Sequence, residues 1–302
     1  MRKVAIAAAV AALAWASVPG AAEAPPVPAE LVAVVKALKP QHGKIAIPAA
    51  KATLDLGETY DFYGAADAAT ILTQVWGNPP ELAQGVLGLV MPAGKSPLTD
   101  AWGAVVTYED TGFVSDSDAD ETDYNALLEQ MRSGEAERNA ERKSGGYAAT
   151  HLVGWAEPPH YDKTAHSIVW ARDIQFEGSD ADTLNYDVRT LGRSGVLSLN
   201  LVSVMPNLPE VKLAAADFAR HASFDSGARY ADYDSSSDRT AEFGVGGLVA
   251  AGVGVAVAKK LGILALLLKF IKPILIGLVV AFGAFRGKIA ALFRRKEDPL
   301  EG

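Results

Sequence analysis

Residues 151–166 contain the densest group of side chains in this chain that could do chemistry. Three histidines fall within 16 residues, with two acids among them: His151, His160 and His166, with Glu157 and Asp162. Imidazole and carboxylate groups are common zinc ligands, and a histidine can also act as a general base. One hypothesis is therefore a hydrolase or a metal-dependent enzyme that uses these three histidines.

The spacing of this cluster argues against a shared site. Neither HExxH nor a comparable zinc-ligand spacing is present. Pro158-Pro159 is expected to form a turn between two strands, which would point the side chains apart. We prefer a rigid polar hairpin turn framed by buried Trp155 and Trp170. No catalytic, metal-binding or cofactor-binding residue is therefore assigned, and no cofactor is expected.

A run of acids, Asp116, Asp118 and Asp120, resembles the beginning of a calcium-binding loop. The sixth position of that loop holds Glu121 instead of glycine, and the twelfth holds Leu127 instead of glutamate. We therefore prefer a role for these acids at the N-terminus of the following helix, where the helix dipole favours negative charge.

Nucleophilic chemistry has weaker support in the sequence. Ser194 and Ser198 lie in or beside a glycine-rich turn, without the GxSxG pattern that exposes a catalytic serine. The glycines of residues 244–254 are embedded in an apolar helical pattern and do not form a phosphate-binding loop. The chain has no cysteine, so thiol chemistry and disulfides are excluded.

The elements that must position these residues belong to an α+β fold, an antiparallel β-meander sheet packed with helices. Residues 147–204 predict four consecutive strands, of which the last two are joined by a hairpin at 192–195. A helix that begins at Asn207, with Glu210 three residues on, is expected to follow. Earlier segments predict two short strands around Pro48 and the elements at 65–76 (helix), 85–97 (loop and short strand), 102–108 (strand) and 124–131 (helix).

Both ends of the chain carry targeting patterns. Residues 1–22 have the basic, apolar and small-residue regions of a secretory signal peptide, with cleavage expected before Glu23. Residues 261–285 form an apolar run of 25 residues, long enough to cross a bilayer as a helix. Lys269 and Lys272 make membrane insertion less favourable, by about 2.5–3.5 kcal/mol each. The favourable contributions of the apolar residues exceed this cost by a small margin.

Charge gives the expected orientation. Residues 23–258 hold 17 Lys and Arg against 33 Asp and Glu, a balance that repels nucleic acid and excludes it as a partner. Residues 286–302 are basic, and positive residues flank the cytoplasmic side of a membrane span. We expect a single-pass protein of the cell inner (cytoplasmic) membrane whose main domain is extracytoplasmic, or periplasmic where there are two membranes.

The predicted organisation assigns each part of the chain a role. The parts are a signal peptide (1–22), a linker and short helix (23–40), an extracytoplasmic α+β domain (41–240), a Gly/Ala-rich helical segment (241–260), a C-terminal transmembrane helix (261–285) and a basic cytoplasmic tail (286–302). A hairpin of two spans, 243–258 and 274–285, is the alternative, although both segments are short for spanning.

Several motifs together resemble a known family of uncharacterised bacterial membrane-anchored proteins, defined by a domain of unknown function. The segments that carry the resemblance are WGNPP at 76–80, GWAEPPHYD at 154–162, LNYDVRTLGRSGVLSLNLV at 184–202 and YADYDSSSDRTAEFG at 230–244. The resemblance covers roughly residues 40–290 and implies an exported, anchored domain, without implying a reaction. A more distant similarity, to the sandwich of photosystem extrinsic-subunit and Mog1-like proteins, rests on the order of elements alone.

The sequence therefore favours a non-enzymatic binding or scaffolding module of the cell envelope, whose first partner is the lipid bilayer through residues 261–285. A second partner class comes from small residues that recur every four positions: Gly246, Ala250, Gly254 and Ala258. On a helix they share one face and would allow close approach of a second helix. That helix could belong to another copy of this chain, to its own anchor or to another envelope protein.

Overall fold

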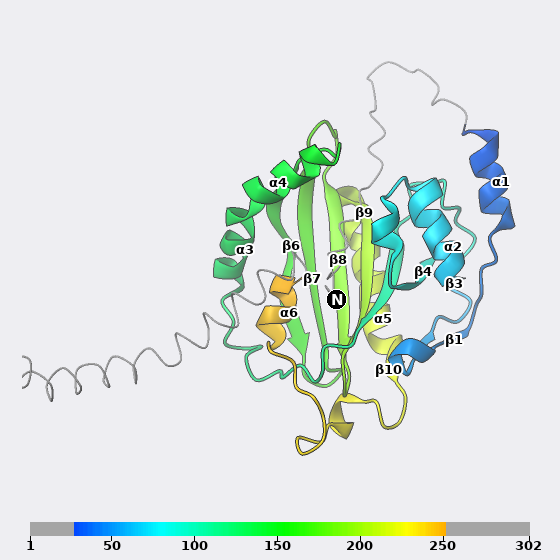
Figure 1. The fold of residues 1–302 in the computed structure, drawn as a ribbon. Coiled ribbons are helices and arrows are strands. Elements are labelled where there is room, and N and C mark those ends of the chain that lie inside the picture. Colours follow the sequence, from blue (N-terminus) through cyan, green and yellow to red (C-terminus); the bar gives the residue numbers. More distant parts are fainter. Residues whose placement is uncertain (1–26, 252–302) are drawn as a thin grey trace, which may run out of the picture.

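The computed structural model describes residues 27–251 as two antiparallel sheets with helices on both faces of the larger one (Figure 1). The large sheet has seven strands in the order β3-β4-β5-β9-β8-β7-β6, and every adjacent pair is antiparallel. The α+β class with an antiparallel sheet is therefore confirmed.

The meander predicted for residues 147–204 forms one half of this sheet. Its strands are β6 (Thr150–Asp162), β7 (Ser167–Phe176), β8 (Thr183–Leu191) and β9 (Val196–Val204). In the predicted turn between β8 and β9, the amide of Gly192 donates a hydrogen bond to the carbonyl of Gly195 over 2.8 Å. The four-strand prediction is confirmed.

One turn was predicted in the wrong place. Pro158 and Pro159 lie within β6, and the chain reverses after Asp162 instead. The β6–β7 register shifts between Glu157 and His160, so the prolines occupy a bulge. Because β6 is the edge strand, a residue without an amide proton is tolerated there.

The other half of the sheet contains one strand, β4, that the sequence pattern does not clearly predict. The strands are β3 (Tyr60–Gly64), β4 (Val86–Pro92) and β5 (Gly103–Glu109), of which β5 pairs with β9. β4 falls in the segment predicted as loop and short strand, where glycine and proline are frequent. Its Leu89, Val90 and Met91 are all buried, so it lacks the alternation by which a half-exposed strand is recognised.

A smaller sheet and one long helix cover the first face of the large sheet. The small sheet consists of β1 (Lys44–Ile47), β2 (Ala52–Asp55) and β10 (Ala222–Phe224), and the helix is α5 (Leu208–His221). Val211, Ala215 and Phe218 of α5 are buried in the main core with residues from both sheets. The helix begins directly after Asn207, as predicted, but the expected side-chain capping bonds are absent, because Asn207 donates to Ser203 Oγ (2.9 Å) and Glu210 accepts from Trp102 Nε1 (3.0 Å).

Four helices lie on the second face. They are α2 (Ala65–Thr70, continued by a wider turn at Ile71–Val75), α3 (Tyr124–Ser133), α4 (Glu135–Ser144) and α6 (Val245–Ala251). α2 packs on β4, whereas α3 and α4 pack on β6. Two separate apolar clusters result, one beneath α2 and one beneath α3 and α6. Figure 1 shows β7 and β8 between these two groups of helices.

The predictions for the two ends fall largely outside the described residues. The signal peptide (1–22), the transmembrane helix (261–285) and the basic tail (286–302) lie wholly outside residues 27–251. A short helix, α1 (Ala29–Ala37), is present in the predicted linker region. Within residues 27–251, no helix combines the length and the hydropathy that a membrane span requires.

Candidate functional site

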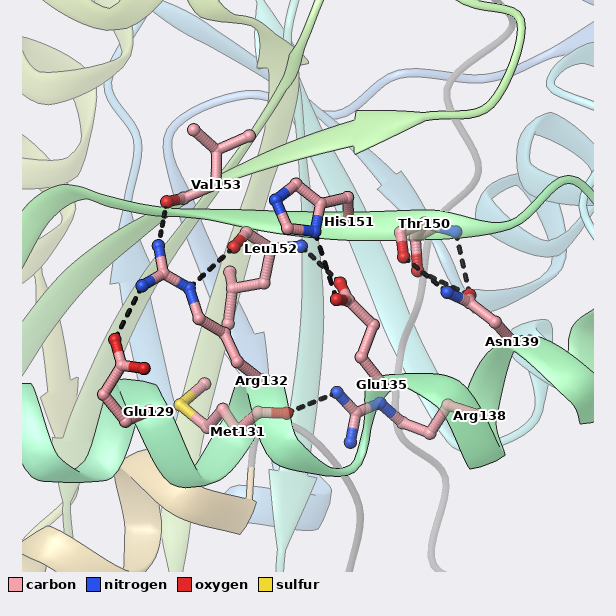
Figure 2. Close-up of polar contacts among 10 residues, drawn as sticks. All are labelled: Glu129, Met131, Arg132, Glu135, Arg138, Asn139, Thr150, His151, Leu152 and Val153. Carbon is pink, nitrogen blue, oxygen red and sulfur yellow. Dashed lines mark hydrogen bonds and ion pairs between the residues drawn. The ribbon is translucent and has the colours of Figure 1, made fainter.

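His151 lies on the edge strand β6 and faces a helix. Its Nδ1 is 3.1 Å from Glu135 Oε2, while Glu135 Oε1 accepts a hydrogen bond from the Leu152 amide over 2.6 Å (Figure 2). Asn139 accepts from the Thr150 amide (2.9 Å) and donates to the Thr150 carbonyl (2.8 Å). His151 is thus one contact in the docking of α3 and α4 against β6.

Through this docking, the highly charged helix α4 binds the backbone of the edge strand β6. The dense charge of α4 is typical of a solvated helical end or loop, yet Glu135 and Asn139 bond to the outer edge of β6. Arg132 of α3 does the same by donating to the carbonyls of Leu152 and Val153 (Figure 2). Such bonds occupy backbone groups that would otherwise be open to another strand, and so protect the edge of the sheet.

The structure separates the three histidines. The register partners of His151 and His160 on β7 are Gln175 and Val169, which are six residues apart and hence about 20 Å along the strand. His166 lies after the end of β6. In the part of the chain that the structure describes, no three His, Asp or Glu side chains are close enough to share a metal ion. The enzyme alternative therefore loses the site on which it was based.

His166 belongs to an aromatic cluster at the end of the sheet. Its Nδ1 is 3.3 Å from Tyr161 Oη, which donates to Asp116 Oδ2 over 2.9 Å. Its ring stacks on Tyr230 with 4.2 Å between centroids. Burial, with Asp116 as a second cause, raises the pKa of both tyrosines above the ordinary value of 10, so they stay protonated donors at neutral pH.

The three acids of the calcium-like run have separate partners. Asp116 binds Tyr161, and Asp120 pairs with Lys163. Asp118 accepts hydrogen bonds from the amides of Val245 (2.8 Å) and Gly246 (3.2 Å) at the start of α6. The helix that Asp118 caps is therefore α6 and not the one that follows it in sequence. α3 is capped by Asp123.

The strongest candidate for a functional site lies elsewhere, on the second face of the large sheet. Six polar side chains there are between 1 and 8% exposed. We call this group the polar face: Arg172 of β7, Asn185, Asp187 and Arg189 of β8, and Ser198 and Asn200 of β9. They are neighbours in register across three adjacent strands.

The alternation of β8 and β9 puts these side chains together. On β9, Val196 belongs to the apolar cluster beneath α3 and α6, and Val202 belongs to the one beneath α2. Ser198 and Asn200 lie between them on the same face. The polar face therefore divides the two apolar clusters of the second face.

Two arginines and two acids balance the charge of this region. Arg172 Nη2 is 3.2 Å from Asp187 Oδ2 and also donates to Asn185 Oδ1 (2.6 Å). Arg189 Nη2 is 3.5 Å from Asp187 Oδ1, and its Nη1 donates to Glu109 Oε1 (3.1 Å). Burial lowers the pKa of Arg172, and Asp187 opposes that shift, so the guanidinium stays charged at neutral pH.

Two amides fix the far side of the polar face. Asn200 Nδ2 donates to Asn185 Oδ1 (2.8 Å), and Asn185 Nδ2 donates back to Asn200 Oδ1 (3.3 Å). The guanidinium of Arg189 lies 5.1 Å from the ring centroid of Trp170. These contacts hold the charged groups in one arrangement, as a site that recognises a ligand by geometry requires.

Three buried donors of this region have no acceptor among residues 27–251. They are Arg189 Nε, Ser198 Oγ and Trp170 Nε1. A buried polar group without a partner costs about 1–3 kcal/mol. The region therefore favours a guest that brings oxygen acceptors.

The sequence signal for this site is the alternation of polar and apolar residues along β8 and β9. Leu184, Tyr186 and Val188 share one face of β8 and alternate with the polar Asn185, Asp187 and Arg189, as the leucines of β9 alternate with Ser198 and Asn200. Because one sheet face is normally solvated, such alternation predicts exposed residues. Their burial, and hence their significance, becomes visible only with the tertiary structure.

The comparison with known families supports the resemblance to a family defined by a domain of unknown function. No curated protein matches the chain. The solution structure of cyanobacterial PsbP (CyanoP) from Synechocystis sp. PCC 6803 is similar at 8% identity and a TM-score of 0.36, over 60% of this chain and 91% of that one. This score is too low to support a functional argument. The family model described as "Protein of unknown function (DUF2167)" matches residues 39–283, and the chain belongs to this family.

Proposed function

We propose that this chain is a membrane-tethered, extracytoplasmic domain that binds or scaffolds another component of the cell envelope without catalysing a reaction. The observation that carries the proposal is the polar face. Buried ion pairs are often replaceable by apolar residues without loss of stability, so stability alone does not explain six buried polar side chains between two apolar clusters. A binding role does explain them.

The connection between the domain and the predicted anchor supports tethering. α6 is part of the folded domain, because its Val245, Leu248 and Val249 are fully buried in the apolar cluster on the second face of the sheet. Only nine residues separate Ala251 from Leu261, where the predicted anchor begins. Nine residues reach about 30 Å at full extension. The domain would therefore stay close to the bilayer.

The position of α6 also supports one span over two. The hairpin alternative needs residues 243–258 as a membrane span, but Val245–Ala251 form α6 and Asp118 caps its first amides. With a single span, the acidic domain and the basic tail lie on opposite sides of the membrane. This arrangement agrees with the excess of positive charge expected on the cytoplasmic side.

Fractionation of cells that express the full chain tests the tether. We expect the chain in the membrane fraction after an alkaline wash, and a matched chain lacking residues 261–285 in the soluble fraction. A reporter active only in the cytoplasm, fused after Gly302, should be active. A reporter that works only outside would establish the hairpin, and full chain in the soluble fraction would contradict the tether.

A further inference from the structure

We propose that the polar face binds the carboxylate group of its ligand, held by the guanidinium edge of Arg189 and the hydroxyl of Ser198. The inference rests on the proposed binding role and gives it a ligand class. Three buried donors without acceptors among residues 27–251, together with the charges around them, point to this ligand class.

Arg189 presents the edge that pairs best with a carboxylate. Its Nη1 is engaged by Glu109 at 3.1 Å, whereas Nε has no acceptor among the described residues. Its Nη2 is 3.5 Å from Asp187 Oδ1, beyond the usual hydrogen-bond range. Nε and Nη2 lie on the same edge of the guanidinium plane, and two parallel N–H donors match the two oxygens of a carboxylate.

Ser198 supplies a further donor on the strand that neighbours Arg189. It is the register partner of Arg189 on β9, so the two Cβ atoms are about 4.5–5.5 Å apart. The residue is 3% exposed, and its hydroxyl has no partner within residues 27–251. A carboxylate oxygen has lone pairs for both Arg189 and Ser198.

The surrounding charges favour a singly charged anion over a doubly charged one. The two arginines are already balanced by Asp187 and Glu109. A carboxylate adds one negative charge to this set, whereas a phosphate dianion adds two against the same acids. Trp170, whose ring lies 5.1 Å from the Arg189 guanidinium, keeps that plane in a fixed orientation.

Titration of the detergent-solubilised full chain with paired probes tests the inference. One pair is tri-alanine and tri-alanine amide, which represents a peptide C-terminus. The other is glucuronate and glucose, which represents a sugar acid. We expect the carboxylate member of at least one pair to bind, and its counterpart without a carboxylate to bind at least about tenfold more weakly, because hydrogen bonds to a charged group are the stronger ones.

Two variants and a control connect binding to the named atoms. Arg189→Lys keeps the charge but removes the two-donor edge, and Ser198→Ala removes only the hydroxyl. Each should weaken binding by about tenfold with an unchanged circular dichroism spectrum. Arg220→Lys, on the exposed face of α5, should leave binding unchanged. Should Arg189→Lys fail to fold, Ser198→Ala decides by itself.

The outcomes separate this inference from the proposed function. Binding by tri-alanine alone identifies a peptide C-terminus as the source, and binding by glucuronate alone identifies a sugar acid. Absence of binding by both acids, or equal binding of a probe and its counterpart without a carboxylate, overturns the carboxylate site while leaving the membrane tether in place. Carboxylate binding by a chain that fractionates as soluble would overturn the tether and keep the site.

Discussion

Arg193 and Asp238 form a two-point ion pair, with 2.8 Å between Nε and Oδ2 and 3.0 Å between Nη2 and Oδ1. Arg193 lies in the β8–β9 turn, and Asp238 lies in the segment that leads to α6. Arg193 also donates its amide to the Ala228 carbonyl (2.9 Å). The pair therefore fixes the path of the chain towards α6.

This pair predicts an acid-sensitive stability. The hydrogen bond from Arg193, followed by that from the Asp234 amide, holds the pKa of Asp238 below its ordinary value of 3.8. A carboxyl whose pKa is lower in the folded state stabilises the fold above its unfolded pKa and loses that effect as pH falls through the folded value. Thermal unfolding of the wild type should therefore lose more stability between about pH 5 and about pH 3 than that of Asp238→Asn.

Asp110→Asn is the matched control for this titration. Asp110 pairs with Arg239, the residue that follows Asp238 in sequence, but the side chain of Asp110 is 71% exposed. Exposed ion pairs contribute about 0–1 kcal/mol, so this variant should follow the wild-type pH profile. Equal acid sensitivity of wild type and Asp238→Asn would contradict a structural role for the Arg193–Asp238 pair.

Protection of the β6 edge predicts a second phenotype. Asn139→Ala leaves the amide and carbonyl of Thr150 without their side-chain partner (Figure 2). We expect a loss of about 1 kcal/mol in the free energy of unfolding by urea, together with increased light scattering from edge-to-edge association. Asn125→Ala, an exposed asparagine of α3, should show neither change. Unaltered stability of Asn139→Ala would mean that water replaces the side chain at no cost.

Much of the fold follows from local pattern. The meander was predictable because Leu197, Leu199 and Leu201 alternate with polar residues, and a glycine-rich turn joins β8 to β9. α5 was predictable from the spacing of its buried stripe. β4 was not, because a strand buried on both faces has no alternation, and the glycines and prolines of residues 85–97 suggested a loop.

The candidate site depends on long-range pairing that local pattern does not encode. Asp187 and Arg172 are on different strands, and they meet only because β7 and β8 pair in one particular register. Likewise, the charged helix α4 looks solvated in sequence, since nothing local indicates that Asn139 will bond to the backbone of β6. The histidines were grouped by sequence distance, but an extended strand keeps His151 and His160 about 20 Å apart.

Ser198→Ala should stabilise the unliganded protein. Its hydroxyl is buried without a partner in the described part of the chain, and removal of such a group relieves a cost of about 1–3 kcal/mol. Urea unfolding without ligand should therefore show a gain of about 1 kcal/mol, while carboxylate binding weakens. Thr190→Ala, on the opposite face of the sheet, tests whether any buried hydroxyl behaves in this way. A destabilised Ser198→Ala would indicate that the hydroxyl has a structural role.

The small-residue stripe divides into two parts with different expected effects. A Cβ atom at Gly246 would lie 2.5 Å from Thr122 Oγ1, so Gly246→Leu should destabilise the domain by about 1–3 kcal/mol. Gly254 lies outside the described residues, and Gly254→Leu should shift the detergent-solubilised chain towards monomer with an unchanged ectodomain spectrum. An unchanged size distribution, or a monomeric wild type, would contradict pairing between copies.

Site-directed labelling tests the central claim, a tethered domain that faces outward, most directly. The chain has no cysteine, so one introduced cysteine reports its own location. Leu213→Cys lies on α5, where the residue is 74% exposed, and Gly302→Cys lies at the end of the basic tail. With a membrane-impermeant maleimide on cells whose outer membrane, where present, is permeabilised, Leu213→Cys should label before lysis and Gly302→Cys only after it. The reverse order, or labelling of both before lysis, would contradict the proposed topology.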